Sequence, residues 1–394
     1  MTKITLFSQI INKLEKNIFR NIVQKLQTDK YNKGIDSWTQ LVSMLFLHFS
    51  GSNSLREISN GLKSATGNLN HMGIKKAPSK SSLSYINGHR SWELYQEYYY
   101  KMLAYLSAIA KFKQQKFRIK SKIYLFDATL ISVCLSVFDW AHYRTSKGAI
   151  KLHTVLDFDS CLPTYVHMTD GKVHETTIAK QMNFRKGSVI VMDRAYIDFK
   201  MLFEWTQAGI FFVTRLKSNI KFNRLEEMPL PEDRHTNILV DEYIELTGEN
   251  SKSDYRKKLR RVVVYNEEKK YVIEILTNNF TWTANTISEL YKSRWMIEIF
   301  FKEVKQLLKI KSFVGTTFNA VLIQIWTAMI TMLILKFLKY IAKYNWCLSN
   351  LVAFLRLNLF VKIELQLWLD NPFEVEDTPM NFYKQESLFH NVGG

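Results

Sequence analysis

The feature that most constrains the fold is a change in the spacing of apolar residues near the end of the first third of the chain. Up to residue 112, apolar residues recur at the steps of amphipathic helices, without strand-like alternation. From residue 123 onward, short apolar runs and two-residue alternation predict strands, first at 123–126, 150–158 and 162–168. A basic stretch, 111–122, separates the two patterns. The sequence therefore predicts an all-helical N-terminal domain followed by an α/β domain.

The N-terminal part is predicted to hold a series of helices. They are expected at residues 10–26, 38–49 (capped by Asp36 or Ser37), 54–62, 80–90 (opened by Ser79) and 95–109. The stretch 80–90 is rich in Ser, Lys, Arg and His, and a helix of this kind after a turn suits a DNA-reading unit. An ordinary helical bundle with a charged rim explains the same pattern.

The α/β part is predicted to form a mixed sheet in which the first three strands make a meander. Its later elements are expected as a helix at 174–182, a strand at 188–192, a helix at 199–207 and a strand at 210–214. Residues 216–285 then interrupt the pattern as a β-rich insertion, with a strand pair at 261–265 and 271–277.

Two or three further helices are predicted up to about residue 369. The apolar run 320–335 is short for a membrane span and contains Gln324, Thr327 and Thr331, so we expect a buried helix. The tail from residue 371 is acidic and then polar, and we expect it to be poorly ordered.

Composition restricts the classes of partner. The chain has a net charge of +18, which favours a polyanion, and nucleic acid is the commonest one. The basic residues are spread along the chain rather than gathered in one cluster, which argues against a membrane surface. The three cysteines, Cys134, Cys161 and Cys347, lie far apart and form no Cys-x-x-Cys pair, which argues against a disulfide framework and a zinc site and favours a reducing compartment.

The stretch from Tyr291 to Lys305 is predicted to be one helix with two unlike faces. At about 100° per residue, Tyr291, Arg294, Glu298 and Lys305 lie on one face. The opposite face is an apolar stripe of Met296, Ile297, Phe300, Phe301, Val304 and Leu308. Thr286 and Glu289 have the spacing of a capping box and predict where the helix begins. A solvated face with internal ion pairs is the alternative interpretation.

Two aspartates, Asp127 and Asp193, each follow a short apolar run predicted to be a strand. On adjacent strands their carboxylates would lie a few ångströms apart, and such a pair stays ionised only with a cation between them. Oxygen ligands without His or Cys favour Mg²⁺ or Mn²⁺, and Glu298 would be the third ligand. A turn role for each Asp is the alternative. The rival acids are Asp139, Asp157, Asp159, Asp170 and Asp198.

Asp, Asp and Glu in this order resemble the catalytic acids of the DDE insertion-sequence transposases of the fourth insertion-sequence (IS-four) family. The family signature Tyr-x2-Arg-x3-Glu-x6-Lys is met by Tyr291, Arg294, Glu298 and Lys305. Residues 126–129 and 191–196 resemble the first-Asp and second-Asp segments, and the match spans about 123–311. Some relatives have Arg-Glu-Ala-Asp after the second Asp. Here the run is Arg-Ala-Tyr-Ile-Asp, so no role of that Glu transfers.

The resemblance implies an RNase H-like catalytic core over 113–312, with the β-rich insertion at about 216–285. It implies a transposon-end binding domain at 1–112 and a C-terminal helical region and tail at 313–394. Asp127, Asp193 and Glu298 would be the catalytic and metal-binding residues, holding two Mg²⁺ ions for which Mn²⁺ could substitute. Tyr291, Arg294 and Lys305 would bind DNA.

The activity implied is metal-dependent cleavage of double-stranded DNA at terminal inverted repeats and strand transfer into target DNA. The resemblance also implies a homodimer in the synaptic complex, without membrane attachment, in the bacterial cytoplasm at the nucleoid. Two alternatives remain open. One is another metal-dependent RNase H-like nuclease or recombinase, and the other is a catalytically inactive DNA-binding relative.

Overall fold

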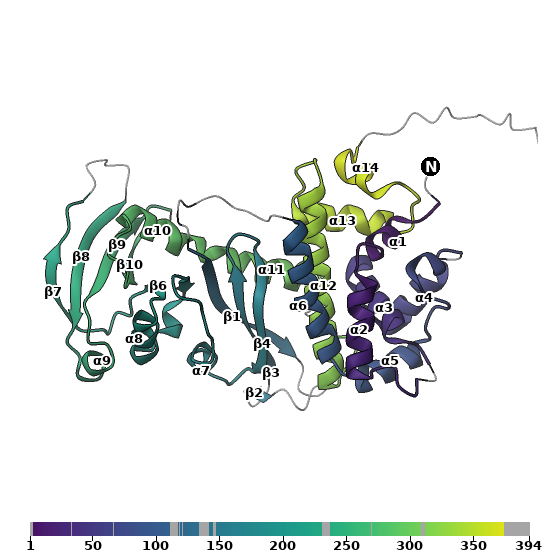
Figure 1. The fold of residues 1–394 in the computed structure, drawn as a ribbon, viewed down its shortest axis with the longest axis horizontal. Helices are drawn as coiled ribbons and strands as arrows, with labels where there is room; N and C mark the ends of the chain where they lie inside the picture. Colours follow the sequence, from purple (N-terminus) through teal and green to yellow (C-terminus); the bar gives the residue numbers. More distant parts are fainter. Residues whose placement is uncertain are drawn as a thin grey trace, which may run out of the picture.

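The structure is a computed structural model of the 394-residue chain. It describes residues 3–373 except 33, 66, 111–116, 118, 120, 134–141, 145–146, 231–236, 269 and 309–311. The predictions for the basic stretch 111–122 and for the tail therefore fall largely outside the described residues. The architecture is a mixed α/β fold, with a large mixed sheet beside a helical body (Figure 1).

The N-terminal helices are α1 (Leu6–Ile11), α2 (Lys16–Leu26), α3 (Ser37–Ser50), α4 (Leu55–Ser64), α5 (Lys80–His89) and α6 (Glu93–Ile109). Two predicted caps are confirmed, because Asp36 and Ser79 each accept a backbone N–H in the first turn of their helix. Ser54, which was predicted to lie inside its helix, caps α4 in the same way. The single helix predicted at 10–26 is wrong. The chain turns between α1 and α2 because the side chain of Leu14 enters the core there, which local periodicity does not reveal.

The first half of the sheet contains β1 (Ile123–Val133), β2 (His142–Arg144), β3 (Lys147–Asp157), β4 (Leu162–Asp170), β5 (Val189–Met192) and β6 (Phe211–Arg215), with helices α7 (Glu175–Ala179) and α8 (Phe199–Gln207). The predicted meander is confirmed, since β3 pairs antiparallel with both β1 and β4. Strands β5 and β6 then continue parallel to β1. The sheet is therefore mixed, as predicted.

The insertion contains β7 (Phe222–Glu227), β8 (Ile238–Leu246), α9 (Glu249–Asp254), β9 (Leu259–Asn266) and β10 (Tyr271–Thr277). The predicted strand pair corresponds to β9 and β10. These strands extend the main sheet, because β10 pairs antiparallel with β6. A buried ion pair joins β8 to β9, with Arg260 donating to both carboxylate oxygens of Asp241 at 2.8 and 2.6 Å. Such a bidentate pair favours one strand register over its neighbours.

The stretch predicted as one helix from Tyr291 to Lys305 is two helices, α10 (Ala284–Ser293) and α11 (Trp295–Leu307). At the junction, Arg294 keeps helical backbone angles, but Ile297 N–H bonds to the carbonyl three residues back rather than four. The cap of α10 is Thr283, which accepts from Thr286 N–H, so the predicted capping box at Thr286 is wrong. The apolar stripe is confirmed: it is buried except for the partly buried Met296.

The C-terminal helices are α12 (Phe318–Ile341), α13 (Leu348–Asn358) and α14 (Leu365–Asp370). Among the described residues, α12 is the one helix long and apolar enough to cross a membrane, but 94% of its apolar window is buried inside the protein. The buried helix predicted at 320–335 is therefore confirmed. The C-terminal segment packs against the N-terminal helices, where Leu6 N–H bonds to Val361 O at 2.9 Å (Figure 1). Together they form one helical body beside the sheet.

Candidate active site

The parallel pairing of β1 and β5 places the two predicted aspartates side by side. The last paired residues are Phe126 and Met192, so Asp127 and Asp193 are the next residues on neighbouring strands. The prediction that Asp127 lies past the end of its strand is wrong, because β1 continues to Val133 through its pairing with β3. Only the pairing with β5 ends before Asp127, so β1 and β5 are no longer paired from Asp127 onward.

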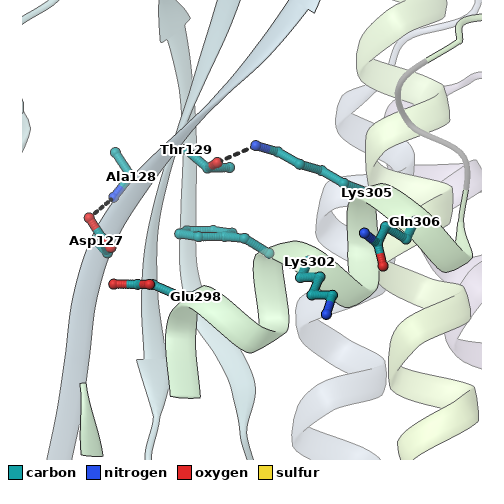
Figure 2. Close-up of a pocket in the computed structure, with 8 residues that line it drawn as sticks. Asp127, Ala128, Thr129, Glu298, Lys302, Lys305 and Gln306 are labelled. Carbon is teal, nitrogen blue, oxygen red and sulfur yellow. Dashed lines mark hydrogen bonds between the residues drawn. The ribbon is translucent and has the colours of Figure 1, made fainter. Parts of the chain in front are cut away.

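The predicted third acid, Glu298, comes from α11, which packs against β1. The guanidinium of Arg294 links it to the first acid, donating to Glu298 Oε1 at 2.5 Å and to Asp127 Oδ2 at 3.4 Å. Figure 2 shows the carboxylates of Asp127 and Glu298 facing each other across the space between strand and helix. These two carboxylates therefore lie within the span of one guanidinium group.

The electrostatics of Asp127 are those of a crowded acid. Burial raises its pKa from 3.8 to about 6. The negative charges of Asp193 and Glu298 raise it too, while the Ala128 N–H and the Arg294 guanidinium act in the opposite direction. Three acidic groups gathered around one position form a site where a cation is strongly favoured.

A cavity of about 330 Å³ extends from these acids along α11 (Figure 2). It is lined by Asp127, Ala128, Thr129, Glu298, Phe301, Lys302, Lys305 and Gln306. Acids lie at one end and cationic or amide groups at the other. Lys305 Nζ donates to Thr129 Oγ1 at 2.5 Å, so the first-Asp strand also holds the lysine of the helix. The cavity thus offers a negative pole for metal ions beside a positive surface for phosphate groups.

The structure brings the six predicted site residues into one region. Tyr291 lies one turn before Arg294, and the guanidinium carbon of Arg294 is 6.0 Å from its ring centroid. Burial raises the pKa of Tyr291, so it remains a neutral hydroxyl beside the site. Asp193 is placed by strand register, and its side chain accepts from Ala195 N–H at 3.0 Å.

Three polar lining residues were missed in the sequence: Thr129, Lys302 and Gln306. A signal for two of them was present. Lys302 lies four residues after Glu298, the helical step that groups the signature residues on one face. Thr129 lies two residues after Asp127, on the same face of the strand. Gln306 carries no charge and had no such signal.

The rival acids of the described region have structural partners elsewhere. Asp157 and Asp159 pair with Lys122 at 2.6 and 3.5 Å. Asp198 caps α8 and pairs with Lys180 at 2.5 Å. The side chain of Asp170 and the whole of Asp139 fall outside the described residues. The three rivals that can be placed therefore serve turns and helix ends rather than the cavity.

The donor set fits hard divalent cations, because the acids supply oxygen ligands only. Among the residues that the structure describes, no three His, Cys, Asp or Glu side chains stand close enough to hold an ion as they are. Between Asp127 and Glu298, the Arg294 guanidinium takes the position of a cation. A group of positive charge already bridges the acids, which supports their use as cation ligands.

Comparison with known families places most of this region in one match. Residues 118–334 match the family model described as "Transposase DDE domain". Residues 2–75 match a second model, described as "Domain of unknown function (DUF4372)". The first match contains all six predicted site residues.

Three curated proteins are similar to the chain. A probable transposase for insertion sequence element IS5377 of Geobacillus stearothermophilus is 29% identical over 225 residues, 57% of this chain and 59% of that protein. A putative transposase y4zB of Sinorhizobium fredii is 33% identical over 199 residues, 50% of this chain and 55% of that protein. A putative transposase for insertion sequence element IS4SA of Synechocystis is 24% identical over 298 residues, 73% and 80% of the two chains.

The match thus spans under two thirds of the length of the first two relatives. Among solved structures, the chain is similar to a piggyBac transposase synaptic complex with hairpin DNA, with a TM-score of 0.42 and 9% sequence identity over 90% of this chain and 78% of that one. At that TM-score the likeness carries no inference about function.

Proposed function

The chain belongs to the transposase DDE domain family, whose model covers more than half of it, and on that premise we propose that it is a DNA transposase. The proposed reaction is cleavage at the inverted repeats of an insertion sequence and strand transfer into target DNA. The observation that carries it is the meeting of Asp127 and Glu298 around one cationic group, with Asp193 on the next strand and Lys305 along the same cavity.

Family membership implies dependence on divalent metal ions. In the proposal, Asp127, Asp193 and Glu298 hold two Mg²⁺ ions, for which Mn²⁺ can substitute. When bound, such ions supply the positive charge that in-line attack at a phosphodiester requires. The oxygen-only donor set and the crowding that raises the pKa of Asp127 support this assignment.

The positive end of the cavity positions the DNA strand. Lys305, oriented by Thr129, and Lys302 both line the cavity and would each neutralise a phosphate group. Glu298 and Lys305 are seven residues apart on α11, a rise of about 10 Å. That length corresponds to about three nucleotide steps along one strand. The cavity can therefore hold the scissile phosphate at one end and a flanking phosphate at the other.

An RNase H-like core is the fold proposed for this function. It is supported by the antiparallel meander of β1, β3 and β4, by the parallel strands β5 and β6 that follow, and by a late helix that supplies the last acid. The β-rich insertion before that helix agrees with the family pattern.

The helical N-terminal domain is proposed to bind the transposon ends. The support lies on α5, whose exposed side chains include Lys80, Ser81, Ser84, Tyr85 and His89. The helix contains no acidic residue. Tyr85 is 65% exposed and its ring stacks on His89 at 4.2 Å. A homodimer that brings two ends together completes the proposal, since each end requires an active site.

The test uses a DNA substrate that carries the inverted repeats flanking the gene. Asp127→Ala, Asp193→Ala and Glu298→Ala are each expected to abolish cleavage and retain end binding, because they remove metal ligands and leave the DNA-binding surfaces intact. Asp159→Ala removes a carboxylate from a surface turn and is expected to keep both activities. Cleavage products are followed on sequencing gels, and binding by electrophoretic mobility shift.

Three outcomes would change the proposal. Full cleavage by one of the three variants removes that residue from the site. Cleavage by the wild-type protein without joining to target identifies a nuclease. End binding by the wild-type protein without any cleavage identifies an inactive relative.

A further inference from the structure

Arg294 has an unusual position for a residue expected to bind DNA, because both of its carboxylate partners are candidate metal ligands. Its side chain is 15% exposed and lies at the junction of α10 and α11. Nη1 faces Asp127 Oδ2 and Nη2 faces Glu298 Oε1. Through these two contacts the guanidinium lies between β1 and α11.

The guanidinium and a divalent ion compete for the same oxygen. Asp127 Oδ1 accepts the Ala128 N–H at 2.8 Å, which leaves Oδ2 as the oxygen directed toward the helix. Oδ2 is the atom that Arg294 contacts. A divalent ion between Asp127 and Glu298 would also lie within a few ångströms of the positive guanidinium, and charges of like sign at that distance repel strongly in a partly buried site.

We infer that Arg294 serves as an internal counter-ion that blocks the metal site of the DNA-free protein and must leave Asp127 and Glu298 before divalent ions bind. The inference rests on the proposed function of these two acids as metal ligands. It adds a state of the site, in which the arginine neutralises the acids and divalent ions bind weakly.

The anion that draws Arg294 away is a phosphate group of bound DNA. Phosphate offers a guanidinium the same bidentate geometry as a carboxylate. The cavity beside Arg294 already presents Lys302 and Lys305 to a DNA strand. Binding of DNA and binding of metal therefore favour each other. Either ligand separates Arg294 from Asp127 and Glu298, so the other binds without the free-energy cost of that separation. The contacts of Arg294 would keep divalent ions out of the active site until a DNA strand is bound.

The experiment measures Mn²⁺ binding to the full chain without DNA, by the electron paramagnetic resonance signal of free Mn²⁺. Arg294→Met keeps an apolar stem and removes the charge. It is expected to bind Mn²⁺ about tenfold more tightly than the wild type, which corresponds to a blocking arginine displaced about one tenth of the time. Arg294→Gln provides a second neutral variant, and thermal unfolding shows that each is folded.

Two controls separate this effect from general changes in charge. Lys292→Met removes a cation two residues away that is 75% exposed and lies near Glu289 rather than the site acids. It is expected to bind Mn²⁺ as the wild type does. Glu298→Gln added to Arg294→Met is expected to abolish the gain, which places the ion at this site. Adding inverted-repeat DNA is expected to tighten Mn²⁺ binding to the wild type more than to Arg294→Met.

Equal Mn²⁺ affinity in wild type and in folded Arg294→Met or Arg294→Gln overturns the inference, and so does an equal gain in Lys292→Met. Absence of Mn²⁺ binding in all of them overturns it as well. These results are independent of the cleavage assay. If the protein cleaves the transposon ends but Arg294 has no effect on Mn²⁺ affinity, the proposed function stands and the inference about the internal counter-ion is wrong.

Discussion

Asp127 is a carboxylate that the fold holds where burial and two acidic neighbours oppose its charge. Such an arrangement disfavours the ionised folded state and is a common property of sites built for cations. The neighbouring Arg294 offsets only part of the effect of burial and of the acidic neighbours, since the pKa of Asp127 stays raised despite the contact. At this scale, function and stability make opposite demands on one side chain.

The pH dependence of the free energy of unfolding can detect the cost of ionising Asp127 in the folded protein. Because the pKa of Asp127 is raised from 3.8 to about 6, the folded chain binds its proton more tightly than the unfolded chain between these values. The contribution of Asp127 to the free energy of unfolding therefore falls as pH rises through this window. Asp127→Asn, which stays neutral, is expected to be more stable than the wild type by about 1 to 3 kcal/mol at neutral pH. The gain should vanish near pH 4.

Urea denaturation at several pH values without divalent ions measures this difference. Asp159→Asn, on a surface turn beside Lys122, is the control in which no such trend is expected. A gain that is the same at all pH values would show that Asp127→Asn acts through packing rather than through charge.

Among the elements, α5 presents a polar and basic face without acids, and its C-terminal end is tied to the start of α12. Asn319 of α12 donates to the carbonyls of Asn87 and Arg90 at 2.9 and 2.7 Å. The inner face of α5 is buried at Leu83 and Ile86, so the helix is held firmly while its outer face remains open. A rigid helix with exposed Lys, Ser, Tyr and His is suited to contact a DNA groove.

Lys80→Ala tests α5 as the end-binding element. Loss of one phosphate contact is expected to weaken binding to inverted-repeat DNA about three- to tenfold and to reduce the salt-dependence slope by about one. Lys339→Ala is the matched control, since Lys339 is an exposed lysine at the other end of α12, roughly 30 Å from the end that α5 contacts. Fluorescence anisotropy over a series of salt concentrations gives both quantities. An equal loss in Lys339→Ala would indicate general charge attraction only.

The whole molecule joins the site to the helical body through α11 (Figure 1). The last carbonyls of this helix are bonded by residues from two other helices: His48 of α3 hydrogen bonds to Leu308 O at 3.0 Å, and Arg356 of α13 donates to Leu307 O. His48 also bonds to Thr327 of α12 at 3.1 Å. The helix that carries Glu298 therefore begins against the sheet and ends in the body that includes the proposed end-binding domain.

His48 should make the whole fold sensitive to acid. Burial lowers its pKa from 6.5 to about 4, so the unfolded chain binds the proton more tightly between these values. Stability contributed by neutral His48 is present above pH 6.5 and is lost as pH falls toward 4, by an amount of about 2 to 3 kcal/mol. His48→Gln, which cannot take up a proton, is expected to lose this part of the pH dependence.

Thermal or urea unfolding between pH 7 and pH 4 measures the effect. His174→Gln changes an exposed histidine and is expected to leave the wild-type pH dependence in place. An unchanged acid sensitivity in His48→Gln would mean that His48 is not the group that titrates.

Most elements of the fold could be predicted because the patterns that specify them are local. Apolar periodicity and capping residues depend on neighbours within a few positions, and they located α3, α5, α8 and the apolar stripe of α11. The spacing of Tyr291, Arg294, Glu298 and Lys305 likewise follows from helical geometry, and it survived the division of the predicted helix because Arg294 keeps helical backbone angles.

Tertiary structure alone decided what these elements do together. Strand β1 extends beyond Asp127 because β3 is there to pair with it, and the insertion joins the main sheet because β10 meets β6. The contact of Arg294 with Asp127 joins residues 167 positions apart. Local periodicity carries no information about such pairings, because they form only where distant segments supply hydrogen-bond and charge partners. The sequence by itself therefore determined which residues could form the site, and only the packed sheet and helices decided that an arginine stands between the acids.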